Sequence, residues 1–84
     1  MHIARIIVKE GVFLIRYNFD IVQALKEAGY NTNYIRTNKL FSESTMSKFR
    51  RNDVNITLQN LDTLCDLLNM QPSEIITFDK LNKD

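Results

Sequence analysis

The sequence is poor in the residues that carry covalent and metal chemistry. It contains one cysteine, one histidine, two glycines and no tryptophan. Cys65 alone cannot form an intramolecular disulfide or the tetrahedral cysteine site of a structural zinc ion. One histidine and one cysteine do not supply a nucleophile with its base and orienting group, and no glycine-rich phosphate loop is present. We therefore expect no enzymatic activity, no catalytic residue, no metal and no cofactor.

Long apolar runs are also missing. The apolar run at residues 6–8 is interrupted by Lys9 and Glu10, which excludes a secretory core or a membrane span of about 20 residues. We expect a cytoplasmic protein with no membrane partner. Eighty-four residues, 44% of them hydrophobic and 25% charged, fit one globular domain over residues 1–84. Such a domain is too small for a buried cleft, so no small-molecule ligand is expected.

The middle of the chain has the pattern of a helix-turn-helix. Two short helical patterns, at residues 32–38 and 42–51, are separated by a tight connection. Met46 and Phe49 lie three apart in the second pattern, which predicts an inward apolar side. The other side is short and polar: Glu43, Ser44, Thr45, Ser47 and Lys48. Because the DNA major groove admits one helix of this width, double-stranded DNA is the predicted partner.

Charge is distributed unevenly, although the net charge is only +1. Residues 36–51 contain five basic side chains (Arg36, Lys39, Lys48, Arg50 and Arg51) and one acid, Glu43. Beyond Arg51, six acids (Asp53, Asp62, Asp66, Glu74, Asp79 and Asp84) outnumber Lys80 and Lys83. The sequence therefore predicts a basic face and an acidic face, which can orient a protein on a polyanion without a large total charge.

The N-terminal segment, residues 3–17, is rich in β-forming residues. A Lys9-Glu10-Gly11 break divides it, which predicts two strands joined by a short turn. Both faces of the second strand are apolar, so one must pack on the domain and the other needs a cover. Residues 75–78 can complete this hairpin within a monomer, or the edge can pair with a second copy or a partner protein. We expect a homodimer through residues 3–17, because an uncovered apolar edge invites pairing.

Helix ends can be placed from capping residues. The first helix is predicted over residues 19–28, with Asn18 as N-cap and Gly29 as a left-handed terminator. Thr57 is predicted to cap a leucine-rich helix that ends at Asn69. Pro72 then begins a last short helix, residues 75–78 are extended, and residues 79–84 form a frayed tail.

Two stretches, SESTMSKFRR at residues 42–51 and TLQNLDTLCDLLNMQPSEII at residues 57–76, resemble a known family. They are similar to the Cro/C1-type (XRE-like) helix-turn-helix regulators of bacteria and phages. The resemblance covers about residues 19–78. It implies a mainly α, five-helix lambda-repressor-like domain over residues 19–78, with an N-terminal strand or hairpin in residues 1–18 that can pair with a C-terminal strand.

The resemblance also implies roles for individual residues. The base-reading residues would be Glu43, Ser44, Thr45 and Lys48. The phosphate-binding residues would be Thr32, Asn33, Ser47, Arg50, Arg51 and Asn55. Lys48 can donate to guanine and Glu43 can accept from cytosine N4. The implied function is sequence-specific DNA binding that regulates transcription, through repression. The alternative is an antitoxin-like or other protein-interaction module that binds little DNA.

Two positions depart from the usual pattern of that family. Arg36 stands inside the second helix where a small Ala is usual, and Leu40 stands in the turn where Gly is usual. Glycine is favoured there because positive φ costs other residues about 1 kcal/mol. The two departures predict an altered angle between the second and third helices.

Overall fold

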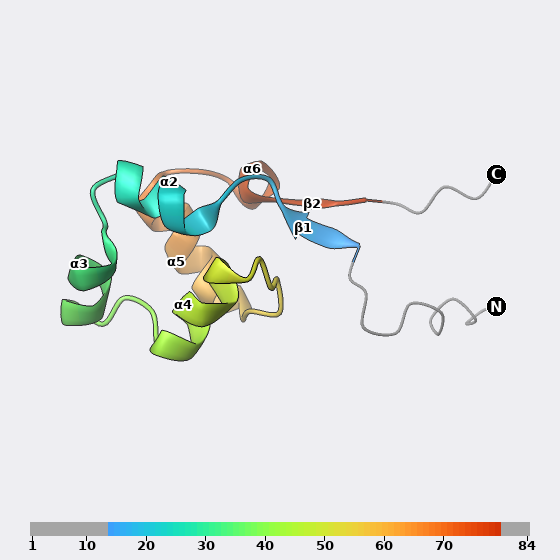
Figure 1. Cartoon of the computed structure of the whole chain (residues 1–84). Helices are drawn as coiled ribbons and strands as arrows, with labels where there is room; N and C mark the ends of the chain where they lie inside the picture. The colour runs from blue at the N-terminus through green and yellow to red at the C-terminus, as the bar shows by residue number, and fades with distance from the viewer. Residues whose placement is uncertain (1–13, 80–84) are drawn as a thin grey trace, which may run out of the picture.

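The structure is a computed structural model that describes residues 14–79, which form five helices and two strands (Figure 1). In chain order these are β1 (Ile15–Tyr17), α2 (Ile21–Glu27), α3 (Thr32–Thr37), α4 (Glu43–Arg50), α5 (Leu58–Leu68), α6 (Pro72–Ile75) and β2 (Ile76–Phe78). The predicted fold class is confirmed: a mainly helical domain in which an N-terminal strand pairs with a C-terminal strand. The first predicted strand, its turn at residues 9–11 and residues 80–84 of the predicted tail lie outside the described residues, whereas Asp79, the first residue of that tail, donates its N–H to the Leu14 carbonyl at 2.7 Å.

β1 and β2 form an antiparallel ribbon in which Tyr17 is opposite Ile76 and Ile15 is opposite Phe78. Alternate residues of a strand share a face, and Tyr17 is buried. Ile15 and Phe78 therefore extend the core-facing side of the ribbon beyond the core, where they are 42% and 60% exposed. Figure 1 shows the ribbon projecting from the helical body at the end away from α3.

The predicted start of the first helix is wrong. α2 begins at Ile21, and Asp20 is its N-cap, with Oδ1 accepting the Gln23 N–H at 3.1 Å. The backbone N–H of Asn18 instead donates to the Ile75 carbonyl at 2.8 Å. This bond extends the pairing of β1 with the C-terminal segment as far as Asn18. Because Asn18 takes part in that pairing, it does not cap the helix, and the helix starts later. Ile75 itself is the last residue of α6 rather than part of the strand.

The other predicted capping and terminating residues are confirmed, and α3 and α4 lie within the predicted ranges 32–38 and 42–51. Gly29 follows α2 with φ +100°, and Asn69 ends α5 in the left-handed conformation with φ +57°. Thr57 caps α5, its Oγ1 accepting the Asn60 N–H at 3.0 Å. Pro72 is the first residue of α6. These residues were identifiable because each supplies a cap or backbone conformation that few other residues supply.

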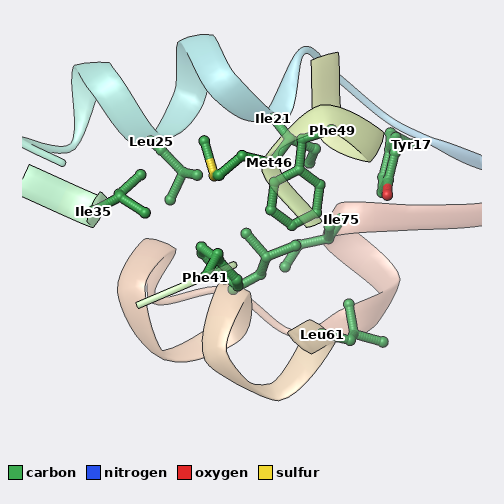
Figure 2. Packing of buried hydrophobic residues seen from close by; sticks show 10 residues of the cluster. Tyr17, Ile21, Leu25, Ile35, Phe41, Met46, Phe49, Leu61 and Ile75 are labelled. Carbon is green, nitrogen blue, oxygen red and sulfur yellow. The ribbon is translucent and has the colours of Figure 1, made fainter. Parts of the chain in front are cut away.

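The core lies between the helices and fixes how α4 is rotated (Figure 2). Phe49 of α4 is 1% exposed and contacts Tyr17 and Phe41 edge to face, with ring centroids 6.2 and 5.1 Å apart. Met46, one turn earlier, is 2% exposed. Full burial of such a side chain contributes about 1.5–3 kcal/mol. Because both residues are held inward, the opposite side of α4 must face solvent.

Candidate nucleic-acid interface

The outward side of α4 follows from the two buried residues of its inward side. Successive residues of a helix are rotated by about 100°, so the side away from Met46 and Phe49 is centred between Ser44 and Ser47. The side chains on this outward face are Glu43, Ser44, Ser47, Lys48 and Arg51. Five of the predicted DNA-contacting residues are thus placed together on one side of one helix.

Thr45 is the exception, and its predicted place on the exposed polar side is wrong. It is 8% exposed. Its hydroxyl oxygen accepts hydrogen bonds from Ser42 Oγ at 3.1 Å and from Asn60 Nδ2 at 3.3 Å. Ser42 Oγ also accepts the Thr45 N–H, at 3.1 Å, as the N-cap of α4. Thr45 therefore ties the start of α4 to α5 and does not face outward.

Glu43, the first residue of α4, forms an ion pair with Arg36 of α3. Arg36 Nε donates to Glu43 Oε2 at 2.9 Å, and the two side chains are 59% and 62% exposed. The pair spans the turn between the two helices of the motif. It joins the unusual Arg36 to the one acid on the outward face of α4.

The turn itself differs from the prediction. The residue with positive φ is Lys39, at +53°, and not Leu40. The Lys39 N–H donates to the Arg36 carbonyl at 3.2 Å, and the Leu40 N–H donates to the Ile35 carbonyl at 3.0 Å. These two bonds form a Schellman motif, which places the left-handed residue one position before Leu40. Leu40 is half-buried and packs its side chain against the core.

The far end of α4 is bonded to the loop that follows it. Arg51 Nη1 donates to Ser47 Oγ at 2.7 Å, and Arg51 Nη2 pairs with Asp53 Oδ2 at 3.1 Å. Lys48 Nζ donates to the Asn55 carbonyl oxygen at 3.0 Å. An ammonium has three donors and a guanidinium five, so both cations retain donors for an external oxygen. Asn55 is exposed beside them.

Tyr17 anchors the same loop from the core side. Its hydroxyl donates to the Asp53 carbonyl oxygen at 2.7 Å. Burial, and secondarily the Asp53 carboxylate, raises the pKa of Tyr17 from 10.0 to about 12. The pKa of Asp53 is lowered, first by the Asn55 N–H at 2.9 Å and then by Arg51. The loop after α4 is therefore held from both sides.

The remaining predicted phosphate ligands lie at the start of α3 and the end of α4. Asn31 is the N-cap of α3, with Oδ1 accepting the Tyr34 N–H at 2.8 Å. Thr32 is half-buried and Asn33 is exposed in the first turn that follows. Arg50 is exposed, and within residues 14–79 it has no carboxylate partner.

The acids of α5 and α6 lie apart from this basic region. Asp62, Asp66 and Glu74 are exposed and line one shallow hollow together with Cys65 and Asn69. Asp53 does not belong to this group, because it pairs with Arg51. Among residues 14–79 no three His, Cys, Asp or Glu side chains are placed to hold a metal ion. No helix in that range is both long and apolar enough to cross a membrane.

Three residues of this region were not identified from the sequence: Arg36 as the partner of Glu43, Asn60 as the partner of Thr45, and Asp53 as the partner of Arg51 and Tyr17. The only signal for the first pair was opposite charge. Charge alone does not predict a contact between residues that belong to two different helices.

Two consecutive helices joined by a tight turn, with a polar and basic outward face on the second, define a helix-turn-helix DNA-binding domain. Residues 21–80 match the family of Cro/C1-type helix-turn-helix DNA-binding domains, and the chain belongs to this family. The resemblance seen in the sequence is thereby confirmed, and double-stranded DNA is supported as the partner. No curated protein and no solved structure matches the chain.

Proposed function

We propose that this protein binds a specific double-stranded DNA sequence with α4 in the major groove and represses transcription by occupying that site. The observation that carries the proposal is the outward face of α4, which presents short polar and basic side chains over a fixed apolar back. Ser44 is exposed near the start of α4 and has no side-chain hydrogen bond to another residue of the described range 14–79, so it is the residue best placed to meet base edges. Glu43 and Lys48 add an acceptor and a donor on either side.

Phosphate contacts would supply affinity and register. Arg50 and Arg51 at the end of α4, with Ser47 and Asn55, are proposed to bind one stretch of backbone. Thr32 and Asn33 are proposed to bind another through their hydroxyl and amide groups. Lys48 and Arg51 already bond the protein's own carbonyl and hydroxyl groups, so their geometry is set before DNA arrives.

We also propose that the protein acts as a homodimer through residues 3–17 and the ribbon to which they lead. Ile15 and Phe78 are cross-strand neighbours that leave an apolar face uncovered. A twofold dimer would present two copies of α4 to half-sites about 34 Å apart. A palindromic operator would follow from that symmetry.

Selection of bound duplexes from a random pool, followed by titration at two salt concentrations, tests the proposal. We expect one recovered motif. Ser44→Ala should change the preference at one base pair, whereas Arg50→Ala should weaken binding to all sequences about equally and reduce the salt slope by about one. Arg16→Ala is the matched control, since it removes the same charge from the ribbon, where Arg16 pairs with Asp79.

Titrated on a duplex with a single half-site, where the proposed dimer contact at the ribbon does not enter, Arg16→Ala should leave both affinity and preference unchanged. Recovery of no motif, with weak binding that neither Ser44→Ala nor Arg50→Ala alters, would contradict the proposal. That result would favour the second candidate, a protein-interaction or antitoxin-like module. The observation that favours this candidate is the exposed apolar set at the ribbon and the start of α5: Ile15, Phe78 and Leu58.

A further inference from the structure

The Arg36–Glu43 ion pair joins α3 to the first residue of α4 on the exposed surface. Its N–O distance is 2.9 Å, yet both side chains are more than half exposed. An exposed pair of this kind contributes little to stability. Because Glu43 is the residue with which α4 begins, the pair is placed to act in DNA binding rather than in stability.

A lone carboxylate at this position would oppose DNA binding. Glu43 stands at the start of α4, the end that leads a recognition helix toward the bases, and DNA phosphates repel it. Arg36 compensates this charge from α3. It does so through Nε and one carboxylate oxygen only. Within residues 14–79, the second oxygen of Glu43 and the terminal nitrogens of Arg36 have no hydrogen-bond partner.

We infer that Arg36 is a positioning residue that holds Glu43 so that its unbonded carboxylate oxygen accepts a hydrogen bond from the N4 amine of a cytosine. The inference rests on the proposed DNA-binding function and deepens it. A carboxylate is the side chain whose acceptors match cytosine N4 in the major groove. The ion pair fixes the carboxylate before binding, and the free guanidinium nitrogens remain available to a neighbouring phosphate.

The test compares four proteins in the same duplex selection: wild type, Arg36→Ala, Glu43→Gln and the double variant. Wild type should prefer cytosine at one position by about tenfold. Arg36→Ala should lose that preference, about tenfold, while the rest of the motif is kept. Glu43→Gln should move the preference at the same position toward adenine, which Gln reads. In the Glu43→Gln background, Arg36→Ala should cause no further change there.

Arg50→Ala is the control for lost charge, because it removes one arginine from the same surface and should lower affinity at every sequence alike. Arg36 is exposed, and Arg36→Ala places alanine within a helix, where alanine is favoured, so this variant should fold. If wild type yields a motif but Arg36→Ala acts like Arg50→Ala, the role of Arg36 is overturned and DNA reading stands. If wild type yields no motif, both the role of Arg36 and the proposed sequence-specific DNA binding are overturned.

Discussion

Tyr17 links the core, the ribbon and the loop after α4. Its ring packs against Phe49 and its hydroxyl donates to the Asp53 carbonyl. Burial of this phenol, and secondarily the charge of the Asp53 carboxylate, favours the neutral form and raises the pKa of Tyr17 from 10.0 to about 12. The sequence did not indicate this bond, because the acceptor is a backbone atom of a distant loop.

The raised pKa gives a testable dependence of stability on pH. Because the folded-state pKa of Tyr17, about 12, exceeds its usual 10.0, the native state holds the phenolic proton more tightly than the unfolded chain. This contribution is fully present below pH 10 and is lost as pH rises through about 12. Tyr17→Phe should lack this alkaline loss. Near neutral pH it should lower the free energy of unfolding by about 1 kcal/mol, through the lost hydrogen bond.

Denaturant unfolding of both proteins from neutral to strongly alkaline pH measures the effect. Tyr34→Phe is the matched control, since it removes an exposed tyrosine hydroxyl and keeps Tyr17. It should retain the alkaline loss of wild type. An unchanged alkaline slope in Tyr17→Phe would show that the phenol does not couple to folding.

At the scale of elements, the helices were predictable and the side on which some polar residues lie was not. Apolar spacing identified α4 and α5 because their buried residues recur at helical intervals. Thr45 was placed outward because its type is polar. Its inward position depends on Asn60, which α5 brings within 3.3 Å. A tertiary partner of this kind leaves no periodic signal in the sequence.

The turn between α3 and α4 was predicted to require a left-handed residue, and it has one. The residue was misplaced by one position because Leu40 packs on the core and the chain reverses at Lys39. Lys39→Gly should therefore raise the free energy of unfolding by about 1 kcal/mol, since it removes the cost of a side chain at positive φ. Leu40→Gly should lower it by about 2 kcal/mol, because it removes buried apolar surface and adds backbone freedom.

Thermal or denaturant unfolding of the two variants compares them directly. The signs should be opposite. Stabilisation by Leu40→Gly, or destabilisation by Lys39→Gly, would mean that the turn is formed as the family's usual pattern suggested rather than as a Schellman motif at Lys39.

At the scale of the whole molecule, the fold and the place of α4 within it were predictable, whereas the side-chain pairs on the outward face of α4 were not. An extended segment at residues 75–78 was predicted, and its pairing with the N-terminal segment was one of the alternatives; the structure forms this pairing between β1 and residues 76–78. The Arg36–Glu43 pair depends on how two helices meet across the turn. The spacing of residues in the sequence shows which of them share a face of one helix. The distance between side chains on two different helices depends on the tertiary fold.

The uncovered end of the ribbon leads to the last prediction, which concerns assembly. Ile15 and Phe78 lie opposite one another and are exposed on a face whose other two residues, Tyr17 and Ile76, are buried and half-buried. If this face joins two copies, Ile15→Ser with Phe78→Ser should convert a dimer into a monomer in sedimentation equilibrium. Binding to a palindromic site should fall on the order of hundredfold, because the two recognition helices are no longer linked.

Binding of the same double variant to a single half-site should be unchanged, because the ribbon projects from the helical body at the end away from α3 (Figure 1), and Ile15 and Phe78 are exposed rather than part of the core behind α4. Tyr34→Ser, which makes the same kind of change at an exposed aromatic of α3, is the control and should remain dimeric. A wild-type protein that stays monomeric both free and on a palindromic duplex would overturn the dimer. Separating two intact subunits should weaken binding only to the palindrome, which needs both subunits. Equal loss on the palindrome and on the half-site would instead mean that the ribbon supports the fold of α3 and α4.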